Sequence, residues 1–343
     1  MMKAVQYLSP KRPFVLRSVS IPEPARDEAR VRIEACGMCR TELHLRDGLL
    51  DLGQRDFTVG HEIAGTIEAV GNDVSATRLG ERVVVYYYEG CGHCAYCLSG
   101  DEQLCPTPVR QPGFSSDGGY AERIVVRARN CVTIPQEVSF AEAAPMGCAG
   151  STAVHACRLA GIKPGDWVVV NGTGGVGLVL LQVARASGAR VIAIGMGPER
   201  MELARALGAE ATIDARDVSD VAAEVIALTG SGADIVFELV GLQETMRKAT
   251  AMLGRRGRLV LIGYTAESYM VHPVELIVKE LQVIGSVGST LQDLHDVVDM
   301  LARGLVRCPI DLTLPLERFE EGLAAIERGN LLGRIVLLPQ SPS

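Results

Sequence analysis

The order of apolar and polar positions is clearest between Asp166 and Arg190, and this stretch organises the middle of the chain. Residues 167–170 form an unbroken apolar run, which is typical of a strand covered on both faces in a parallel sheet. Three glycines follow at the spacing G-x-G-x-x-G. The next residues, to about Ser187, lack proline and are rich in Leu, Val and Ala. They predict a helix that ends at Gly188.

From this stretch onward, apolar runs alternate with helical patterns as far as Val287. The predicted strands are 190–194, 211–213, 234–240, 258–262 and 280–287, and the predicted helices are 199–207, 217–228 and 243–253. Such a βαβ series predicts a doubly wound parallel sheet with right-handed crossovers.

The flanking regions follow a different pattern. Val31–Ala35 alternates as a half-buried strand does, a second alternating strand ends at Gly71, and Arg82–Tyr88 is a further strand candidate. A helix is expected from about Ser151 to Ala160. The tail from Gly288 is expected to contain helices and one last strand, 334–338.

The glycine turn is a candidate phosphate cradle. Glycines let the backbone turn tightly and approach a pyrophosphate, and the following helix offers unpaired N–H groups and the positive end of its dipole. The alternative is a tight strand-to-helix turn with a purely structural role. The strand-and-helix context favours dinucleotide binding, with these candidate residues: Gly172, Gly174, Gly175, Val176 and Gly177.

Composition narrows the class of protein. A chain of 343 residues is long enough for two domains, and its net charge of −7 argues against a nucleic-acid partner, which would need a basic surface. No apolar run approaches the ~18 residues of a membrane span, and the N-terminus lacks the apolar region of a signal peptide. We therefore expect a cytoplasmic protein with no membrane partner.

Four of the ten cysteines lie in a polar segment, 89–105, with the spacing C-x2-C-x2-C-x7-C. Such a segment cannot bury enough apolar surface to hold its own shape, so a bound metal would give it a reason to be ordered. Four thiolates can complete a tetrahedral zinc shell with no open position, which describes a structural site. The alternatives are an iron–sulfur cluster or four unrelated cysteines. The predicted ligands are Cys91, Cys94, Cys97 and Cys105.

With these motifs located, the chain resembles the zinc-containing medium-chain alcohol dehydrogenases over nearly its whole length. The resemblance is carried by CRTELH at Cys39–His44, GHE at Gly60–Glu62, the four-cysteine segment, and Cys148 followed by GTGGVG at Gly172–Gly177. It implies an α/β protein in which a GroES-like catalytic domain, residues 1–149 and 287–343, carries an inserted Rossmann dinucleotide-binding domain, residues 150–286.

The resemblance also implies a catalytic zinc. Its ligands would be Cys39, His61 and Cys148, with Glu62 beside the metal as a neighbour or occasional ligand. Three protein ligands leave one position for a substrate oxygen. Taken singly, each residue is as easily read as a buried structural side chain. Glu42 stands where the family usually has an aspartate that contacts the ligand histidine, so that contact is expected to be longer or redirected.

A proton relay is implied next to this metal. In the family, a hydroxyl at the position of Thr41 and an imidazole at the position of His44 pass the substrate proton outward through the cofactor ribose. A hydroxyl both donates and accepts, and histidine titrates near neutrality. The alternatives are a helix cap for Thr41 and a solvated surface position for His44.

The choice of nicotinamide cofactor is predicted from the second strand of the βαβ series. That strand ends in Gly195 and not in the carboxylate that usually accepts the ribose 2′-hydroxyl of NAD. Arg200 lies one helical turn further and could pair with a 2′-phosphate, although a solvated helix face would also explain it. We therefore expect NADP(H) over NAD(H), with Val240 as another cofactor contact. Arg334 resembles the family arginine that reaches the pyrophosphate or nicotinamide half.

The expected function is zinc-dependent hydride transfer between NADP(H), or NAD(H), and an alcohol, aldehyde or ketone. An NADPH-dependent enoyl reductase of the same superfamily is the alternative, and a non-enzymatic cofactor- or zinc-binding protein is a third reading. The intact zinc ligands together with Thr41 and His44 favour the first. The resemblance further implies a homodimer or homotetramer.

Overall fold

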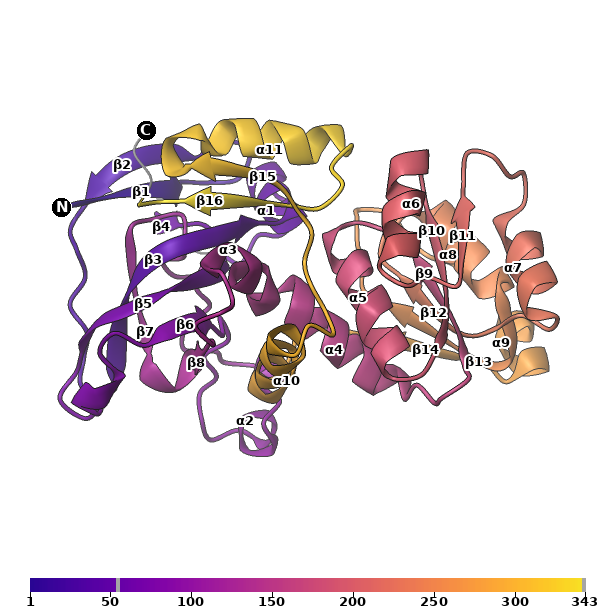
Figure 1. Cartoon of the computed structure of the whole chain (residues 1–343), viewed down its shortest axis with the longest axis horizontal. Coiled ribbons are helices and arrows are strands. Elements are labelled where there is room, and N and C mark those ends of the chain that lie inside the picture. Colours follow the sequence, from indigo (N-terminus) through magenta and orange to yellow (C-terminus); the bar gives the residue numbers. More distant parts are fainter. Residues whose placement is uncertain (54–55, 341–343) are drawn as a thin grey trace. The chain divides into compact units, whose positions relative to one another are not determined.

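The computed structural model describes residues 1–53 and 56–340, and the chain divides into two compact units. The first unit comprises Met1–Ser151, Ser289–Gly304 and Cys308–Ser343. The second comprises Thr152–Gly288 with Leu305–Arg307. Figure 1 follows both units by element label and sequence colour.

The first unit is built on a mostly antiparallel seven-stranded sheet, in the order β15-β16-β3-β5-β6-β8 with β7 paired to β3. A three-stranded sheet, β2-β1-β4, belongs to the same unit. The alternation predicted at 31–35 is confirmed within β3, where Val31 and Ile33 are fully buried. The strands are β1 Met2–Tyr7, β2 Val15–Val19, β3 Glu28–Met38, β4 Phe57–Thr58, β5 Glu62–Val70, β6 Arg82–Val85, β7 Arg123–Arg127, β8 Cys131–Thr133, β15 Ile310–Pro315 and β16 Arg334–Leu338.

Short helices connect these strands, and helix α11 contacts both α1 and β15. The helices with residues in this unit are α1 Arg40–Asp47, α2 Ala95–Ser99, α3 Phe140–Ala143, α4 Ala149–Ala160, α10 Leu291–Ala302 and α11 Phe319–Arg328. The 3₁₀ turns are η1 Ala76–Arg78, η2 Glu102–Leu104, η3 Ala128–Asn130, η4 Ala144–Gly147 and η5 Leu316–Arg318.

Two sequence predictions for this unit were wrong. The tail contains a second strand, β15, which pairs parallel to β16. The strand predicted over 82–88 ends at Val85, because the buried Asn130 side chain holds the next three residues out of the ladder. Its Nδ2 group donates to the carbonyl oxygens of Tyr86 and Tyr88, each at 2.9 Å. The Tyr86 N–H donates to the backbone carbonyl oxygen of Asn130 at 2.8 Å, so Asn130 satisfies this stretch through both its side chain and its backbone.

The second unit is a six-stranded parallel sheet in the order β11-β10-β9-β12-β13-β14. Numbered from β9, this is the strand order 3-2-1-4-5-6 of the doubly wound dinucleotide-binding fold, as predicted. The strands are β9 Trp167–Asn171, β10 Arg190–Gly195, β11 Ala211–Asp214, β12 Ala233–Glu238, β13 Leu253–Leu261 and β14 Gln282–Gly285. The helices are α5 Gly175–Ala186, α6 Pro198–Ala206, α7 Val221–Thr229, α8 Gln243–Ala251 and α9 Pro273–Lys279.

The start of α7 shows how a local cap sets a boundary. The pattern predicted a helix from residue 217, but it begins at Val221. The Asp220 carboxylate accepts the backbone N–H groups of Ala222 and Ala223, at 2.9 and 3.1 Å, and so caps the helix. The apolar faces of these helices and strands give the unit its own core, which includes Val169, Ile192 and Val236.

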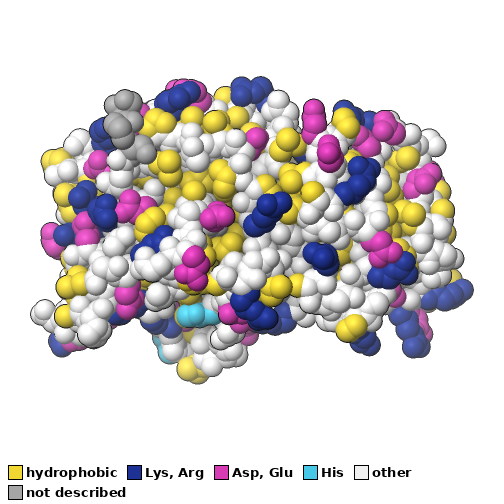
Figure 2. Space-filling model, in the orientation of Figure 1, with side chains coloured by type: hydrophobic (Ala, Val, Ile, Leu, Met, Phe, Trp, Pro, Cys, Tyr) yellow, Lys and Arg dark blue, Asp and Glu magenta, His cyan; other side chains and the backbone are white. Residues whose placement is uncertain are grey.

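Charged side chains of both signs are mixed on the surface. Figure 2 shows basic and acidic side chains interspersed over the face it draws. In the described part of the chain, no helix combines the length and the apolar character that a membrane crossing requires.

Candidate catalytic and cofactor sites

A buried cluster of cysteine, histidine and glutamate side chains lies in the first unit. The candidate ligand atoms of Cys39, His61, Glu62 and Cys148 all lie within 4.8 Å of one another. Cys39 caps the start of α1, His61 and Glu62 lead into β5, and Cys148 follows turn η4. The structure therefore brings together all four residues that the resemblance implied for the catalytic metal.

Glu42 holds two members of this cluster in place. One carboxylate oxygen accepts the backbone N–H of Cys39 at 2.7 Å, and the other lies 3.0 Å from Nδ1 of His61. Glu42 is fully buried, so both contacts are shielded from water. At 3.0 Å the histidine contact has an ordinary length, so the expectation of a longer contact was wrong.

Arg334 is the cationic partner within the cluster. Its Nη2 lies 2.6 Å from Glu62 Oε1 and 3.8 Å from Cys39 Sγ. Gly37 makes room for this pair, because a Cβ at residue 37 would lie 2.0 Å from Glu62 Oε2. The sequence predicted that Arg334 contacts the cofactor, but in this structure Arg334 is paired with Glu62 of the metal cluster.

The cluster has the electrostatics of a cation site. Burial alone would lower the pKa of His61, but the Glu42 carboxylate and the Cys39 sulfur together outweigh burial and raise that pKa to about 10. The Cys148 thiol and the Arg334 charge together lower the pKa of Cys39, while burial raises the pKa of Glu62 to about 7. The surroundings of His61 thus favour a positive charge at this point.

The donor atoms fit zinc. His61 Nε2 is buried and makes no hydrogen bond with the residues described. With Nδ1 turned toward Glu42, this nitrogen is the one left to bind a metal. Two sulfurs and one imidazole nitrogen form a donor set that zinc accepts, and three protein ligands leave a position for substrate.

Thr41 and His44 both belong to α1, three residues apart, and so lie on the same side of that helix. Thr41 Oγ1 lies 3.4 Å from Cys39 Sγ, next to the cluster. The cap of α1 is Cys39, so the helix-cap alternative for Thr41 was wrong. His44 is half-buried, and burial lowers its pKa below its usual value near 6.5.

An aromatic group covers one side of His61. The Phe114 and Tyr87 ring centroids lie 4.7 and 5.2 Å from the histidine ring, and these two rings stack on each other at 5.3 Å. Tyr87 and Phe114 are distant in the sequence, so only the tertiary structure brings the two rings together. Both rings therefore lie next to the metal cluster.

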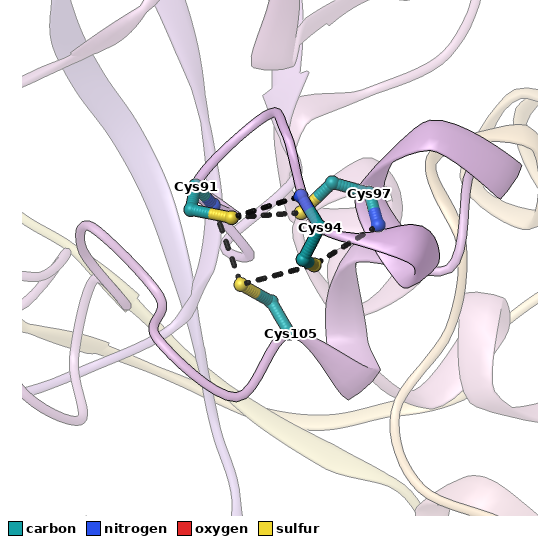
Figure 3. A group of neighbouring side chains, drawn as sticks. All are labelled: Cys91, Cys94, Cys97 and Cys105. Carbon is teal, nitrogen blue, oxygen red and sulfur yellow. Dashed lines mark hydrogen bonds between the residues drawn. The ribbon is translucent and has the colours of Figure 1, made fainter.

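The second cluster comprises the four cysteines of segment 89–105, whose sulfurs converge in Figure 3. The Cys91–Cys97 and Cys94–Cys105 sulfur pairs are each 3.9 Å apart. Sulfurs at the corners of a zinc tetrahedron lie about 3.8 Å apart, since each Zn–S bond is about 2.3 Å. The four side chains therefore fit a zinc ion.

Backbone N–H groups stabilise thiolates in this cluster. The N–H groups of Cys94 and Cys97 point at Cys91 Sγ and Cys94 Sγ, both at 3.4 Å. The N–H of His93 is the main group that lowers the pKa of Cys91, to about 6. The His93 ring contacts the Cys91 carbonyl oxygen at 3.0 Å and is not among the converging ligand atoms.

The glycine turn lies in the second unit, between β9 and α5. Gly172 has φ of 115°, which favours glycine, and a Cβ at residue 177 would lie 1.9 Å from the Gly172 carbonyl oxygen. A Cβ on Gly174 would meet nothing within 4 Å, so that glycine leaves open space in front of the helix. Gly175, Val176 and Gly177 form the first turn of α5, with no side-chain cap. This cradle fits a pyrophosphate.

Two other predicted cofactor contacts lie at the same edge of the sheet. A Cβ at Gly195 would lie 2.0 Å from Thr173 Oγ1, and Val240 Cγ2 lies 3.1 Å from the position of a Cβ on Gly172. Arg200 lies in the first helical turns of α6 and is half-buried. Parallel strands direct their carboxyl ends to this edge, where dinucleotides bind in such folds.

Glu238 orders the loop that carries Val240, a role that sequence reasoning missed. Its buried carboxylate accepts the N–H groups of Val240 and Gly241, at 3.2 and 2.9 Å, and the hydroxyl of Thr245 at 2.7 Å. The signal for it was a carboxylate directly after the apolar run of the strand, IVFE.

Comparison with known proteins places this fold and these two clusters in one family. Residues 25–136 match the alcohol dehydrogenase GroES-like domain, and residues 175–303 match the zinc-binding dehydrogenase domain. The chain therefore belongs to the zinc-containing alcohol dehydrogenases, as its motifs indicated, and it combines a GroES-like domain with a Rossmann domain. It is accordingly an oxidoreductase of the alcohol dehydrogenase type.

Individual relatives match from end to end. An alcohol dehydrogenase of Geobacillus stearothermophilus is 36% identical over 98% of this chain and 99% of its own length. An NAD-dependent alcohol dehydrogenase of Sulfurisphaera tokodaii is 34% identical over 98% of this chain and 100% of its own. The crystal structure of the alcohol dehydrogenase of Aeropyrum pernix superposes with a TM-score of 0.92 at 32% identity, over 98% of this chain and all of that one.

Proposed function

We propose that the enzyme transfers hydride reversibly between a nicotinamide cofactor and an alcohol or carbonyl substrate at the Cys39–His61–Cys148 cluster. The observation that carries this proposal is the convergence of two sulfurs and one free imidazole nitrogen in a buried cluster. The residues that supply them span 109 positions of the chain, from Cys39 to Cys148. When bound, zinc supplies Lewis-acid polarisation of the substrate oxygen, and the nicotinamide gives or takes hydride.

The chain's own residues hold the reactants and move the proton. Glu42 orients the His61 ring and the Cys39 backbone, so the ligand geometry is set before substrate binds. The Thr41 hydroxyl, next to the cluster, accepts the proton that an alcohol releases while it gives up its own, and His44 on the same helix face passes that proton outward. Lowering of the His44 pKa by burial keeps the ring neutral, and able to accept, at pH 7.

The test combines metal analysis with an activity survey. We expect two zinc ions per chain, with NAD(P)H-dependent turnover of aldehydes or ketones and oxidation of the matching alcohols. Cys39→Ser removes one zinc and the activity, whereas Cys131→Ser, at a buried cysteine outside both clusters, changes neither. Turnover of enoyl thioesters without carbonyl turnover would favour the enoyl reductase instead. Cofactor binding without turnover of any of these substrates would indicate a non-enzymatic role.

We propose that the substrate carries an apolar or aromatic group next to its reacting carbon. The support is the stack of Tyr87 on Phe114 beside His61, because flat apolar faces near the metal cluster gain most from burying similar groups. Exchange of Phe114 for Ala is expected to raise KM for aryl substrates more than for ethanol.

We propose NADP(H) as the preferred cofactor. The support is the end of β10 at Gly195, followed by Met196, Gly197 and Pro198, with no carboxylate in this run to repel a 2′-phosphate. The Sulfurisphaera relative is named as NAD-dependent, so this chain would differ from it. Comparing kcat/KM with NADPH and NADH decides the matter, and a strong NADH preference would overturn the proposal.

We propose that two copies join along β14 to form a homodimer, which itself could pair into a homotetramer. The support is that β14 is the last strand in the order of its sheet, with Val283 41% exposed, and that α9 beside it leaves Ile277 and Val278 71% and 58% exposed. An apolar strand edge of this kind pairs readily with another copy. Val283→Lys is expected to shift light-scattering mass toward the monomer.

We also propose that the GroES-like catalytic domain spans 1–149 and 287–343 and that the Rossmann domain spans 150–286. The division of the contacts near residues 151 and 289 supports these boundaries. We propose a cytoplasmic location because all ten cysteines are free of disulfides. Free thiols are typical of a reducing compartment.

A further inference from the structure

The carboxyl ends of β10 and β11 lie side by side, and they place an ion pair over the turn that follows β10. Gly195 is paired with Asp214 in the parallel register, and the N–H of Ala215 donates to the Gly195 carbonyl oxygen at 2.8 Å. The neighbouring strand therefore delivers Asp214 and Arg216 to the strand end where β10 itself has no charged residue. In folds of this class, that strand end faces the adenosine ribose of the dinucleotide.

Asp214 has no acceptor position left for a ribose hydroxyl. Its Oδ1 accepts the backbone N–H and the Nε–H of Arg216, both at 3.1 Å. Its Oδ2 accepts the N–H of Gly197 at 2.9 Å and an Nη2–H of Arg216 at 2.7 Å. A carboxylate offers about four lone-pair sites, so all of them are used. Asp214 thus differs from the strand-end carboxylate that selects NAD in related folds.

Arg216 keeps donors available. Guanidinium has five N–H groups, and the contact with Asp214 uses one at Nε and one at Nη2, which leaves three. The side chain is 52% exposed, and its Nη2 lies 3.7 Å from the position of a Cβ on Gly197. It therefore lies over the Gly195–Gly197 turn, beside a cavity of about 480 Å³. The cavity is lined by Pro198, Met201, Arg205, Thr212, Asp214, Arg216 and Asp217.

We propose that Arg216, held in position by Asp214, is the residue that binds the 2′-phosphate of NADP(H). This assignment deepens the proposed cofactor preference and rests on the proposed function only in requiring a nicotinamide dinucleotide. It replaces Arg200, the residue expected from sequence, as the main phosphate contact. Guanidinium pairs with phosphate through two parallel hydrogen bonds, and Nη1 with the second Nη2 hydrogen can supply them.

Acidic side chains near Arg216 limit how strongly it attracts a phosphate. Asp217 and Glu199 act on its guanidinium together with Asp214, and the cavity wall also carries Arg205. Charges of both signs are therefore present, so selectivity depends on the directed hydrogen bonds of Arg216 and not on a broad positive field.

The test measures binding without turnover. NADPH and NADH are titrated by nucleotide fluorescence into the full-length zinc-loaded enzyme and its Arg216→Ala and Arg216→Gln variants. Competition with 2′,5′-ADP and with 5′-AMP isolates the adenosine end. We expect NADPH and 2′,5′-ADP to bind on the order of 10- to 100-fold more weakly in both variants. NADH and 5′-AMP should change less than about twofold.

Arg190→Ala is the matched control. Arg190 is similarly exposed, at 49%, and also pairs with a carboxylate, Glu210, but at the opposite end of β10. The Arg190→Ala substitution removes the same charge and should leave the affinities for NADPH, NADH, 2′,5′-ADP and 5′-AMP unchanged. Equal weakening of NADPH and NADH in the Arg216 variants, or a loss of NADPH binding in Arg200→Ala alone, would overturn the assignment. Selective NADPH binding by a wild-type enzyme that turns over no alcohol would overturn the proposed reaction and leave this assignment standing.

Discussion

The two cysteine-containing clusters reach similar donor sets by opposite routes. Cys91, Cys94, Cys97 and Cys105 lie within one polar segment and remain partly exposed. The other cluster draws Cys39, His61 and Cys148 from three separate places in the chain, with His61 and Glu62 fully buried. A local cluster can order only its own loop, whereas a buried cluster built from several elements can leave a coordination position facing a pocket. On this difference rests our proposal that the first cluster is structural and the second catalytic.

The largest expected effect is a loss of catalytic rate when a ligand of the buried cluster is replaced. Cys39→Ser should lower kcat/KM for the best alcohol on the order of 10³-fold or more, because the Lewis acid leaves with its ligand. The melting temperature should change little, since the fold around the site is supported by two sheets. Steady-state kinetics and calorimetry measure both. A variant that keeps its second zinc and full activity would show that the buried cluster is not catalytic.

Glu42→Ala should have the next largest effect. It leaves His61 Nδ1 and the Cys39 N–H without their partner, and loss of such a contact typically costs about 10- to 100-fold in metal affinity or activity. Zinc affinity by competition with a chelating dye is the direct measurement. Glu42→Gln serves as the comparison, because it retains the shape and an acceptor for one of the two contacts. Unchanged zinc affinity in both variants would contradict the role assigned to Glu42.

Cys97→Ser should act mainly on stability. Losing the metal of the local cluster is expected to lower the melting temperature by about 10 °C, at about 2–4 °C per kcal/mol for a protein of this size. Activity measured well below that temperature should remain within about threefold of wild type. Differential scanning calorimetry with zinc analysis gives the result. A rate loss as large as that of Cys39→Ser, without unfolding, would erase the distinction between the clusters.

The smallest effect concerns pH. Burial lowers the pKa of His44, and the nearby Arg40 adds to this, while Cys39 and Asp47 oppose it. The neutral, accepting ring therefore persists below pH 6.5, and alcohol oxidation should fall only when the pH drops below that lowered pKa. His44→Gln should lower kcat by about tenfold or less and remove this acid limb. His93→Gln, in the cysteine segment, should leave the pH profile unchanged.

Much of the fold could be read from short-range pattern. The run at 167–170, the three glycines and the helix to Ala186 formed a continuous unit, and each step depends only on neighbours. The four-cysteine segment was equally local. The last strand, β16, was found because RIVLL is a short apolar run, whereas β15, with the sequence IDLTLP, is mostly exposed and shows no such run.

By itself, the sequence determined the parallel sheet, the glycine cradle and the local cysteine cluster, because contacts over a few residues decide them. The tertiary structure alone decided what depends on distant partners. It set Glu42 against His61, used Asn130 to hold the tyrosines out of a strand, and paired Arg334 with Glu62. In the tertiary structure every acceptor position of Asp214 is also used, while Arg216 keeps unused donors. The spacing of residues along the chain cannot show which donors and acceptors are used.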